Sequence, residues 1–255
     1  MARPVSQQSK PLEHRVALVT AAAGVGIGGS VARRLHADGA RVIVSDVHAG
    51  RLDKICSELD IEGAVIDVAD PVALADHIGR VEAAHGHIDI LVNCAGVNVV
   101  KPTWELSDSE WTHTFDVNLH AAFRAVRVAL PPMIARNSGA IVSIASIAAW
   151  DPPQHEVAYA TSKAALIGFT RALAREVAAT GVRVNAVAPG FVENPFLEKL
   201  YGRERMHSLR ESAPLHRGVK PEEVAGVVAW LASDEAEYVT GETITIAGGT
   251  FFRHA

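Results

Sequence analysis

The sequence predicts an α/β fold, a single doubly wound domain in which a parallel sheet of about seven strands carries helices on both faces. Short β-branched runs alternate with longer amphipathic segments from residue 15 to the end, which is the pattern of repeated βα units. The 255 residues suit one ordinary domain of this class. No internal repeat and no linker rich in Pro, Gly or Ser divides the chain, which favours one domain over two.

The expected strands are short, apolar and rich in β-branched residues. They are residues 16–20, 41–45, 64–67, 88–93, 140–145, 183–187 and 243–246.

Amphipathic segments between these strands predict helices. One follows the first strand at residues 29–37, Asp70 with Pro71 starts another, and Ser107 with Glu110 forms a capping box that opens a long helix to residue 136. A second long helix is expected over residues 155–180.

Two segments lie outside this pattern. Residues 1–14 are polar and contain two prolines, so they are expected to form a flexible N-terminal tail and to leave 15–255 as the domain. Residues 190–218 fit no βα unit and are expected to form a lobe that binds substrate.

Composition and charge exclude several classes of function. A net charge of −5 lacks the basic excess of nucleic-acid-binding proteins, and no apolar run approaches the roughly 18 residues of a membrane span. Cys56 and Cys94 are too few for a disulfide framework, so a cytoplasmic location is expected. The 12 histidines lack the spacing of metal ligands, so no metal is expected.

A glycine-rich loop follows the first predicted strand. Gly24, Gly26 and Gly28 lie between that strand and an amphipathic helix. Glycines in this context let the backbone approach a pyrophosphate, whose charge is met by the N–H groups at the helix N-terminus. Simple turn chemistry also produces glycine-rich loops, so the indication comes from the strand-turn-helix context.

Asp46 ends the second predicted strand. An acidic residue at this spacing accepts hydrogen bonds from the ribose of NAD and repels the 2′-phosphate of NADP. The alternative is that Asp46 caps the following helix. No basic residue directly follows it, so the sequence favours NAD as cofactor.

The order of motifs along residues 15–249 resembles the short-chain dehydrogenase/reductase family, and within it the 3-oxoacyl-acyl-carrier-protein reductases. A Tyr-x-x-x-Lys pair alone is weak evidence, whereas the complete ordered set is specific. The motifs are the glycine-rich loop, Asp67-Val68, Asn93-Cys94-Ala95-Gly96, Asn118, Ser146, Tyr159 with Lys163, Pro189-Gly190, Thr240-Gly241 and Gly248-Gly249.

This resemblance implies a Rossmann-type, nicotinamide-dependent oxidoreductase that moves a hydride between the cofactor and a secondary alcohol or ketone. Tyr159 and Lys163 share one helical face, so the ammonium is expected to favour the ionised phenol that acts as acid or base. Ser146 would hydrogen-bond the substrate oxygen. The resemblance gives Asn118 the task of holding a water that links Lys163 to solvent; the alternative is a buried asparagine at a helix kink.

The resemblance also implies the cofactor contacts. They are Gly24, Gly26, Ile27, Gly28, Asp46, Asp67, Val68, Asn93, Ala95, Gly96, Tyr159, Lys163, Pro189, Gly190, Val192 and Asn194. The chain departs from the family at two of its positions. Ala21 replaces the first glycine in a loop one residue longer, in which Gly24 would make the tight turn, and Asn194 replaces a threonine that contacts the nicotinamide carboxamide.

The predicted lobe suggests the substrate. Five Lys and Arg residues against three Glu give residues 198–217 a local charge of +2, which would attract coenzyme A or acyl carrier protein bearing a 3-oxoacyl or 3-hydroxyacyl group. The alternative is an amphipathic helix with solvated charges. The basic residues are Lys199, Arg203, Arg205, Arg210 and Arg217.

Other interpretations remain open at this point. The substrate could instead be a hydroxysteroid or another small alcohol. A methyltransferase shares the glycine-rich loop but has no use for Ser146, Tyr159 and Lys163 together, and a nucleotide-binding interaction protein would not need these polar residues. The resemblance further implies a homotetramer paired through the two long helices.

Overall fold

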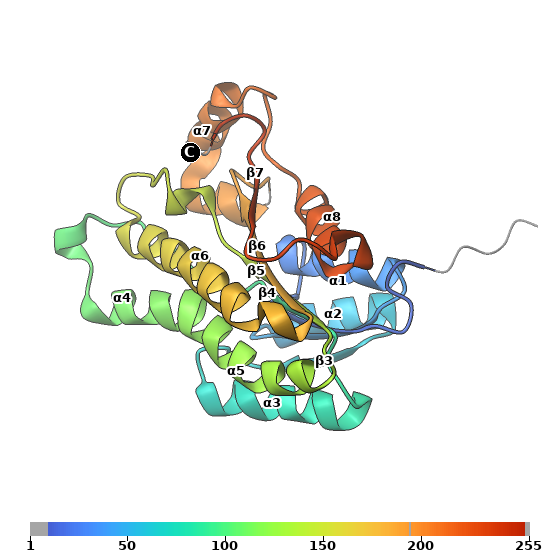
Figure 1. The fold of residues 1–255 in the computed structure, drawn as a ribbon. Coiled ribbons are helices and arrows are strands. Elements are labelled where there is room, and N and C mark those ends of the chain that lie inside the picture. Colours follow the sequence, from blue (N-terminus) through green and yellow to red (C-terminus); the bar gives the residue numbers. More distant parts are fainter. Residues whose placement is uncertain (1–9, 194, 253–255) are drawn as a thin grey trace, which may run out of the picture.

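The computed structural model describes residues 10–193 and 195–252. A seven-stranded sheet lies at its centre, with strand order β3-β2-β1-β4-β5-β6-β7 and parallel pairing throughout (Figure 1). The predicted doubly wound fold is therefore confirmed. The strands are β1 (Val16–Thr20), β2 (Arg41–Asp46), β3 (Glu62–Val65), β4 (Ile90–Asn93), β5 (Gly139–Ile144), β6 (Val182–Pro189) and β7 (Thr243–Ile246).

Helices cover both faces of this sheet (Figure 1). One large buried core joins the sheet to α1, α2 and α8, and a second joins it to α3, α5 and α6. Among the described residues, no helix is both long and apolar enough to cross a membrane. The helices are α1 (Ile27–Ala37), α2 (Ala49–Leu59), α3 (Pro71–His85), α4 (Asp108–Phe115), α5 (Ala121–Ala135), α6 (Val157–Val177), α7 (Pro195–Ser212, kinked at Gly202) and α8 (Pro221–Ala232).

The marked helix starts form as predicted. The Asp70 side chain accepts hydrogen bonds from two backbone N–H groups of α3, with Pro71 in the first turn. Ser107 and Glu110 form the capping box of α4. The predicted long helix over 107–136 is wrong in one respect, because a π-helical turn, Asp116–His120, separates α4 from α5.

The observed strand bounds differ most from the predicted ones in β3, an edge strand of the sheet. β3 ends at Val65, two residues before the predicted end, so Asp67 lies beyond it. β3 is an edge strand whose residues are mostly exposed, so it lacks the buried apolar run on which the strand predictions relied. The Asp67 carboxylate accepts a hydrogen bond from the N–H of Ala69 and turns the chain toward α3.

The described part of the predicted tail is attached to the domain. Leu12 is buried in the core, and its N–H donates to the carbonyl of Asp38. One apolar side chain thus fixes residues 10–14, whereas residues 1–9 of the predicted tail lie outside the described residues.

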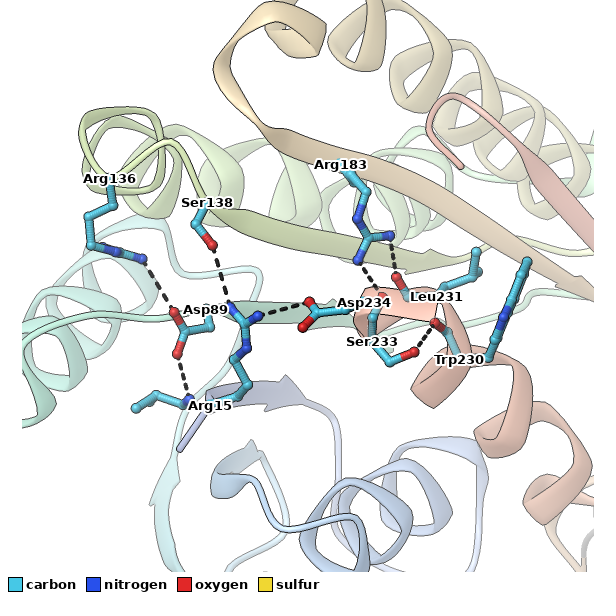
Figure 2. Close-up of polar contacts among 10 residues, drawn as sticks. Arg15, Asp89, Arg136, Ser138, Arg183, Trp230, Leu231, Ser233 and Asp234 are labelled. Atoms are coloured by element: carbon cyan, nitrogen blue, oxygen red, sulfur yellow. Dashed lines mark hydrogen bonds and ion pairs between the residues drawn. The ribbon is translucent and has the colours of Figure 1, made fainter. Parts of the chain in front are cut away.

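Polar contacts join the elements at the amino edge of the sheet (Figure 2). Arg15 pairs with Asp234 at 2.9 Å, and Asp89 accepts the N–H of Val16 at 2.8 Å. Arg183 donates to two carbonyls at the end of α8. This edge is occupied by structural contacts, which leaves the carboxyl edge for ligands.

Candidate active site

The glycine-rich loop is held against the end of β2. Asp46 uses both carboxylate oxygens, one for the N–H of Ala23 and the other for the N–H of His48, each at 3.0 Å. Burial raises the pKa of Asp46, and the hydrogen bond from the Ala23 backbone and the charge of Arg51 oppose that rise. His48, rather than Asp46, occupies the N-cap position of α2. The structure thus places Asp46 beside the loop, as a nucleotide site requires.

Close backbone contacts explain the glycines of this loop. A side chain at Gly28 would collide with the carbonyl of Ala21, and one at Gly29 with the carbonyl of Gly24. Gly24 has a φ of +114°, which favours glycine and agrees with its predicted turn. Ala21 also adopts a positive φ, +51°, at the position where the family has glycine. Sequence reasoning did not single out Gly29, although it continues the run of glycines.

The loop leads directly into α1. Gly26 is its N-cap residue and provides no side-chain cap, so the first N–H groups of the helix point toward the carboxyl edge without a side-chain acceptor. Ile27 begins the helix. Such an N-terminus fits a pyrophosphate, and together with Asp46 it makes the residues present suitable for a dinucleotide.

The ends of the central strands add further predicted cofactor residues. Asn93 ends β4, and its side-chain amide donates to Ser143 of β5 at 3.2 Å. Ala95 and Gly96 follow. A Cβ atom at Gly96 would lie 3.3 Å from Lys163 Nζ, so glycine leaves room for this lysine.

Other predicted cofactor residues lie along the same edge. Val68 is buried and Asp67 is exposed after β3. Pro189 ends β6, and the Gly190 N–H donates to the carbonyl of Ile246 at 2.9 Å. Val192 pairs with Val219 in an isolated parallel bridge. The predicted residue Asn194 lies outside the described residues.

Helix α6 brings Tyr159 and Lys163 beside Ser146. Tyr159 forms a side-chain hydrogen bond with Ser146, which follows β5. Lys163 Nζ lies 5.7 Å from the centroid of the Tyr159 ring and donates to the carbonyl of Ile144 at 2.7 Å. Three predicted catalytic side chains therefore meet at the carboxyl edge.

Burial affects the protonation of both Tyr159 and Lys163. Burial raises the pKa of Tyr159, and the Ser146 hydrogen bond opposes that rise. Burial also lowers the pKa of Lys163 to about 8. The Lys163 ammonium is directed at a backbone carbonyl, and both groups are desolvated. The expectation that Lys163 favours the ionised phenol stays a prediction.

Asn118 lies in the π-helical turn and is almost fully buried. Its side-chain oxygen accepts the N–H of Val97 at 2.8 Å, and its amide donates to the carbonyl of Val97 at 3.0 Å and to Ser162 Oγ at 2.9 Å. Ser162 in turn donates to the carbonyl of Tyr159. The side chain of Asn118 thus links the loop after β4 to the helix of Tyr159, a role that the sequence did not reveal.

Glu156 is a further residue that sequence reasoning missed. It directly precedes α6 and is only 3% exposed. Asn98, in the loop after β4, donates its side-chain amide to Glu156 Oε2 at 2.9 Å. The sequence signal was a carboxylate three residues before Tyr159, but its burial depends on a partner 58 residues away.

The predicted lobe, residues 190–218, contains helix α7, which lies above β6 and β7 in the view of Figure 1. A cavity of about 310 Å³ between lobe and sheet is lined mainly by apolar side chains such as Phe191, Leu215 and Ile246. Two of the basic lobe residues are paired, Arg210 with Glu193 at 2.9 Å and Arg217 with Glu223 at 2.6 Å. These pairs reduce the free positive charge that the sequence predicted.

Known proteins resemble this chain over nearly its whole length. A family model described as Enoyl-(Acyl carrier protein) reductase matches residues 21–250. The (5R,7aS)-5-hydroxy-7a-methyl-1-oxo-2,3,5,6,7,7a-hexahydro-1H-indene-carboxyl-CoA reductase of Mycobacterium tuberculosis is 39% identical, covering 92% of this chain and 93% of the relative. The 3-oxoacyl-(acyl-carrier-protein) reductase FabG of Thermotoga maritima is 38% identical, covering 93% and 98%.

A solved structure shares this fold. The crystal structure of gox2181 superimposes with a TM-score of 0.89 at 32% sequence identity, covering 95% of this chain and 97% of that chain.

Proposed function

The chain belongs to the short-chain dehydrogenase/reductase family and is a nicotinamide-dependent oxidoreductase of alcohols and ketones; from this premise we propose that Ser146, Tyr159, Lys163 and Asn118 are its active-site residues. The observation that carries the proposal is the hydrogen bond between Ser146 and Tyr159, with the Lys163 ammonium 5.7 Å from the Tyr159 ring. When bound, the nicotinamide exchanges a hydride with the substrate carbon.

In this proposal, side chains of the protein bind the substrate oxygen and transfer its proton. Tyr159 gives its phenolic proton to a carbonyl oxygen during reduction and takes it back during oxidation. Ser146 donates a hydrogen bond to the same oxygen as its charge develops. Lys163 is held by the Ile144 carbonyl within reach of the Tyr159 ring, and Asn118 fixes the neighbouring loop.

Replacement of Tyr159 by Phe tests this assignment. Y159F keeps the ring and loses the proton donor, so turnover should fall by about 10³-fold or more while NADH binding, measured by fluorescence, is retained. Turnover within tenfold of the unmodified enzyme would overturn the assignment.

We further propose NAD as the preferred cofactor. Asp46 supports it, because a buried carboxylate beside the loop would repel a 2′-phosphate. The remaining proposed cofactor contacts are the residues predicted along the carboxyl edge, Asn194 included. The expected cytoplasmic location stays a prediction.

As substrate we propose a 3-oxoacyl or 3-hydroxyacyl thioester. The named activities of the Mycobacterium and Thermotoga relatives support a carrier-bound acyl group, and the apolar cavity beside the lobe offers space of a suitable kind. The test compares kcat/KM for a thioester and its free keto analogue in the enzyme and in an R203A/R205A variant. A loss confined to the thioester is expected, whereas equal losses on both substrates would contradict carrier recognition.

We also propose a homotetramer formed through α4, α5 and α6. Trp111, Phe123 and Val157 lie on these three helices and are each more than one-third exposed. Apolar side chains gathered on neighbouring helices are typical of an interface between copies.

A further inference from the structure

A side chain of α1 holds the second half of the glycine-rich loop, residues 24–26. The Nη1 atom of Arg33 donates a hydrogen bond to the carbonyl of Gly24 at 3.2 Å. The first half of the loop is fixed by β2 instead, where the N–H of Ala22 donates to the carbonyl of Ser45 at 3.1 Å. The loop is therefore held from two directions, by the sheet and by α1.

Arg33 is itself fixed by a carboxylate of α2. Its Nε and Nη2 atoms donate to the two oxygens of Glu58 at 2.7 and 2.6 Å, and such a bidentate pair sets the plane and direction of the guanidinium. The hydrogen bond from Arg33 lowers the pKa of Glu58, so this carboxylate is charged at neutral pH. The third nitrogen, Nη1, is thus directed at Gly24 from a position that two helices determine.

The direction of the Gly24 carbonyl decides what the loop presents to an anion. A trans peptide is planar, so its C=O and its N–H point in opposite directions. Because the carbonyl of Gly24 faces Arg33, the N–H of Val25 points away from Arg33, and Val25 itself is 67% exposed. Glycine at position 24 would permit other orientations of this peptide, so the Arg33 hydrogen bond selects one of them.

We propose that Arg33, fixed by Glu58, is a positioning residue for the cofactor. It keeps the Gly24 carbonyl turned toward α1, so the loop offers N–H groups rather than this oxygen to the pyrophosphate. The inference rests on the proposed cofactor site. Without Arg33, the peptide after Gly24 would also adopt orientations in which its oxygen repels the anion, and the apparent affinity would fall with the fraction of loops in the binding conformation.

The test measures NADH binding by fluorescence in the full-length protein and in R33M, which keeps an apolar stem but has no donor. If the loop then occupies the binding conformation about one-tenth of the time, the Kd for NADH rises about tenfold. Hydrogen–deuterium exchange of residues 21–29 should be faster in the variant without cofactor. At saturating NADH, kcat should stay within about twofold, because the loss is one of cofactor binding.

Arg34 provides a matched control on the same helix. It pairs with Asp38 at 2.8 Å, so R34M also removes one positive charge and one ion pair from α1 but leaves the Gly24 contact in place. The Kd for NADH and the exchange of the loop should both be unchanged in R34M. Exposed ion pairs contribute little to global stability, so the two variants should unfold at similar urea concentrations.

Two further variants separate positioning from simple attraction of charges. R33K keeps the positive charge, but an ammonium cannot reproduce the bidentate pair together with the Gly24 contact, so the Kd for NADH should rise as in R33M. E58Q releases Arg33 and makes the surroundings of the loop more positive by one charge. Attraction alone would tighten NADH binding in E58Q, whereas positioning predicts binding that is weaker by about threefold or more.

The outcomes separate this inference from the proposed function. If NADH does not slow exchange in the loop of the unmodified protein, the proposed cofactor site fails whatever the variants do. If NADH does slow it, an equal Kd in R33M and R34M, full affinity in R33K or unchanged or tighter binding in E58Q overturns only the role of Arg33. Should R33M not fold, E58Q decides alone, because its change lies at an exposed residue of α2.

Discussion

At the residue scale, Asp46 holds the glycine-rich loop with the same two oxygens that we propose for the ribose of the cofactor. It accepts the N–H groups of Ala23 and His48, so its carboxylate is fixed before any ribose arrives. Arg51 lies nearby, with its side chain 3.7 Å from the position of a Cβ on Gly24. The Arg51 guanidinium therefore lies close to the position where Asp46 would repel the 2′-phosphate of NADP.

Replacing Asp46 with Ser should change the cofactor preference. We expect D46S to lower kcat/KM for NAD by about tenfold or more and to raise that for NADP, because the repulsion is lost and Arg51 remains available. Steady-state kinetics with both cofactors provide the measurement. D53S, which removes an acidic residue from the exposed side of α2, is the matched control, and an unchanged NADP:NAD ratio in D46S would refute the proposed preference.

His77 is another buried polar residue, far from the active site on α3. Its side chain is 3% exposed, and its Nε2 has no hydrogen-bond partner among the described residues. Burial, with the nearby charge of Arg80, lowers the pKa of His77. The folded protein therefore favours the neutral ring more strongly than the unfolded chain does.

This lowered pKa predicts a loss of stability in acid. Above pH 6.5 the ring is neutral in both states and contributes nothing; as the pH falls below 6.5, the unfolded chain takes up a proton that the folded protein resists, so stability decreases. H77L should therefore lose less free energy of unfolding between pH 7 and 5.5 than the unmodified protein in urea titrations. H113L, at an exposed histidine, should follow the unmodified protein, and equal slopes in H77L would contradict the prediction.

At the scale of elements, the π-helical turn between α4 and α5 determines where the Asn118 side chain lies. It presents Asn118 to the backbone of Val97 while α5 continues beyond it. Single π turns often occur at functional sites because they redirect a side chain without ending the helix. Here the redirected amide joins the loop after β4 to α6 through Ser162.

Removing this amide should weaken both stability and activity. N118A leaves the N–H and carbonyl of Val97 without their partner, so the free energy of unfolding should fall by about 2 kcal/mol or more. Turnover should fall as well, since the loop beside Tyr159 loses its attachment. Chemical denaturation and steady-state kinetics measure the two effects. H120A, at the exposed end of the same turn, should change stability by less than about 0.5 kcal/mol, and comparable losses in both variants would contradict this role.

The elements differ in how far the sequence could predict them. Local signals were sufficient for α3 and for the start of α4, because Asp70 and the Ser107–Glu110 box act on their own first turns. The π turn could not be predicted, since alternating apolar residues continue through it and nothing local marks the changed hydrogen bonding. The burial of Glu156 was equally hidden, because its partner Asn98 comes from another part of the chain.

At the scale of the whole molecule, the two edges of the sheet have different tasks. Arg15, Asp89 and Arg183 join strand starts to neighbouring elements at the amino edge (Figure 2), whereas the proposed catalytic and cofactor residues gather at the carboxyl edge. Parallel strands make this separation possible, because all of them end on the same side. Changes at one edge are thus expected to act mainly on folding and at the other mainly on chemistry.

The proposed tetramer gives a prediction at this scale. Phe123 on α5 is 44% exposed and lies edge-on to Phe169 of α6. F123E should disrupt a tetramer formed through these helices, because a carboxylate would be buried between copies. Light scattering coupled to gel filtration measures the mass. V72E, at an exposed apolar residue of α3, should remain tetrameric, and a monomeric unmodified protein would refute the assembly.

The bridge between Val192 and Val219 has a consequence for how this enzyme could be altered. Hydrogen bonds of 2.8 Å join Val219 to Phe191 and Glu193, so the intervening segment leaves and re-enters the domain at one point. Closing a longer segment at such a point costs little, about 0.6 kcal/mol for each doubling of length. The segment between Val192 and Val219 can therefore be exchanged as a unit. Homologous segments of different length could be inserted between these two valines, which would vary the substrate preference while the rest of the catalytic domain stays unchanged.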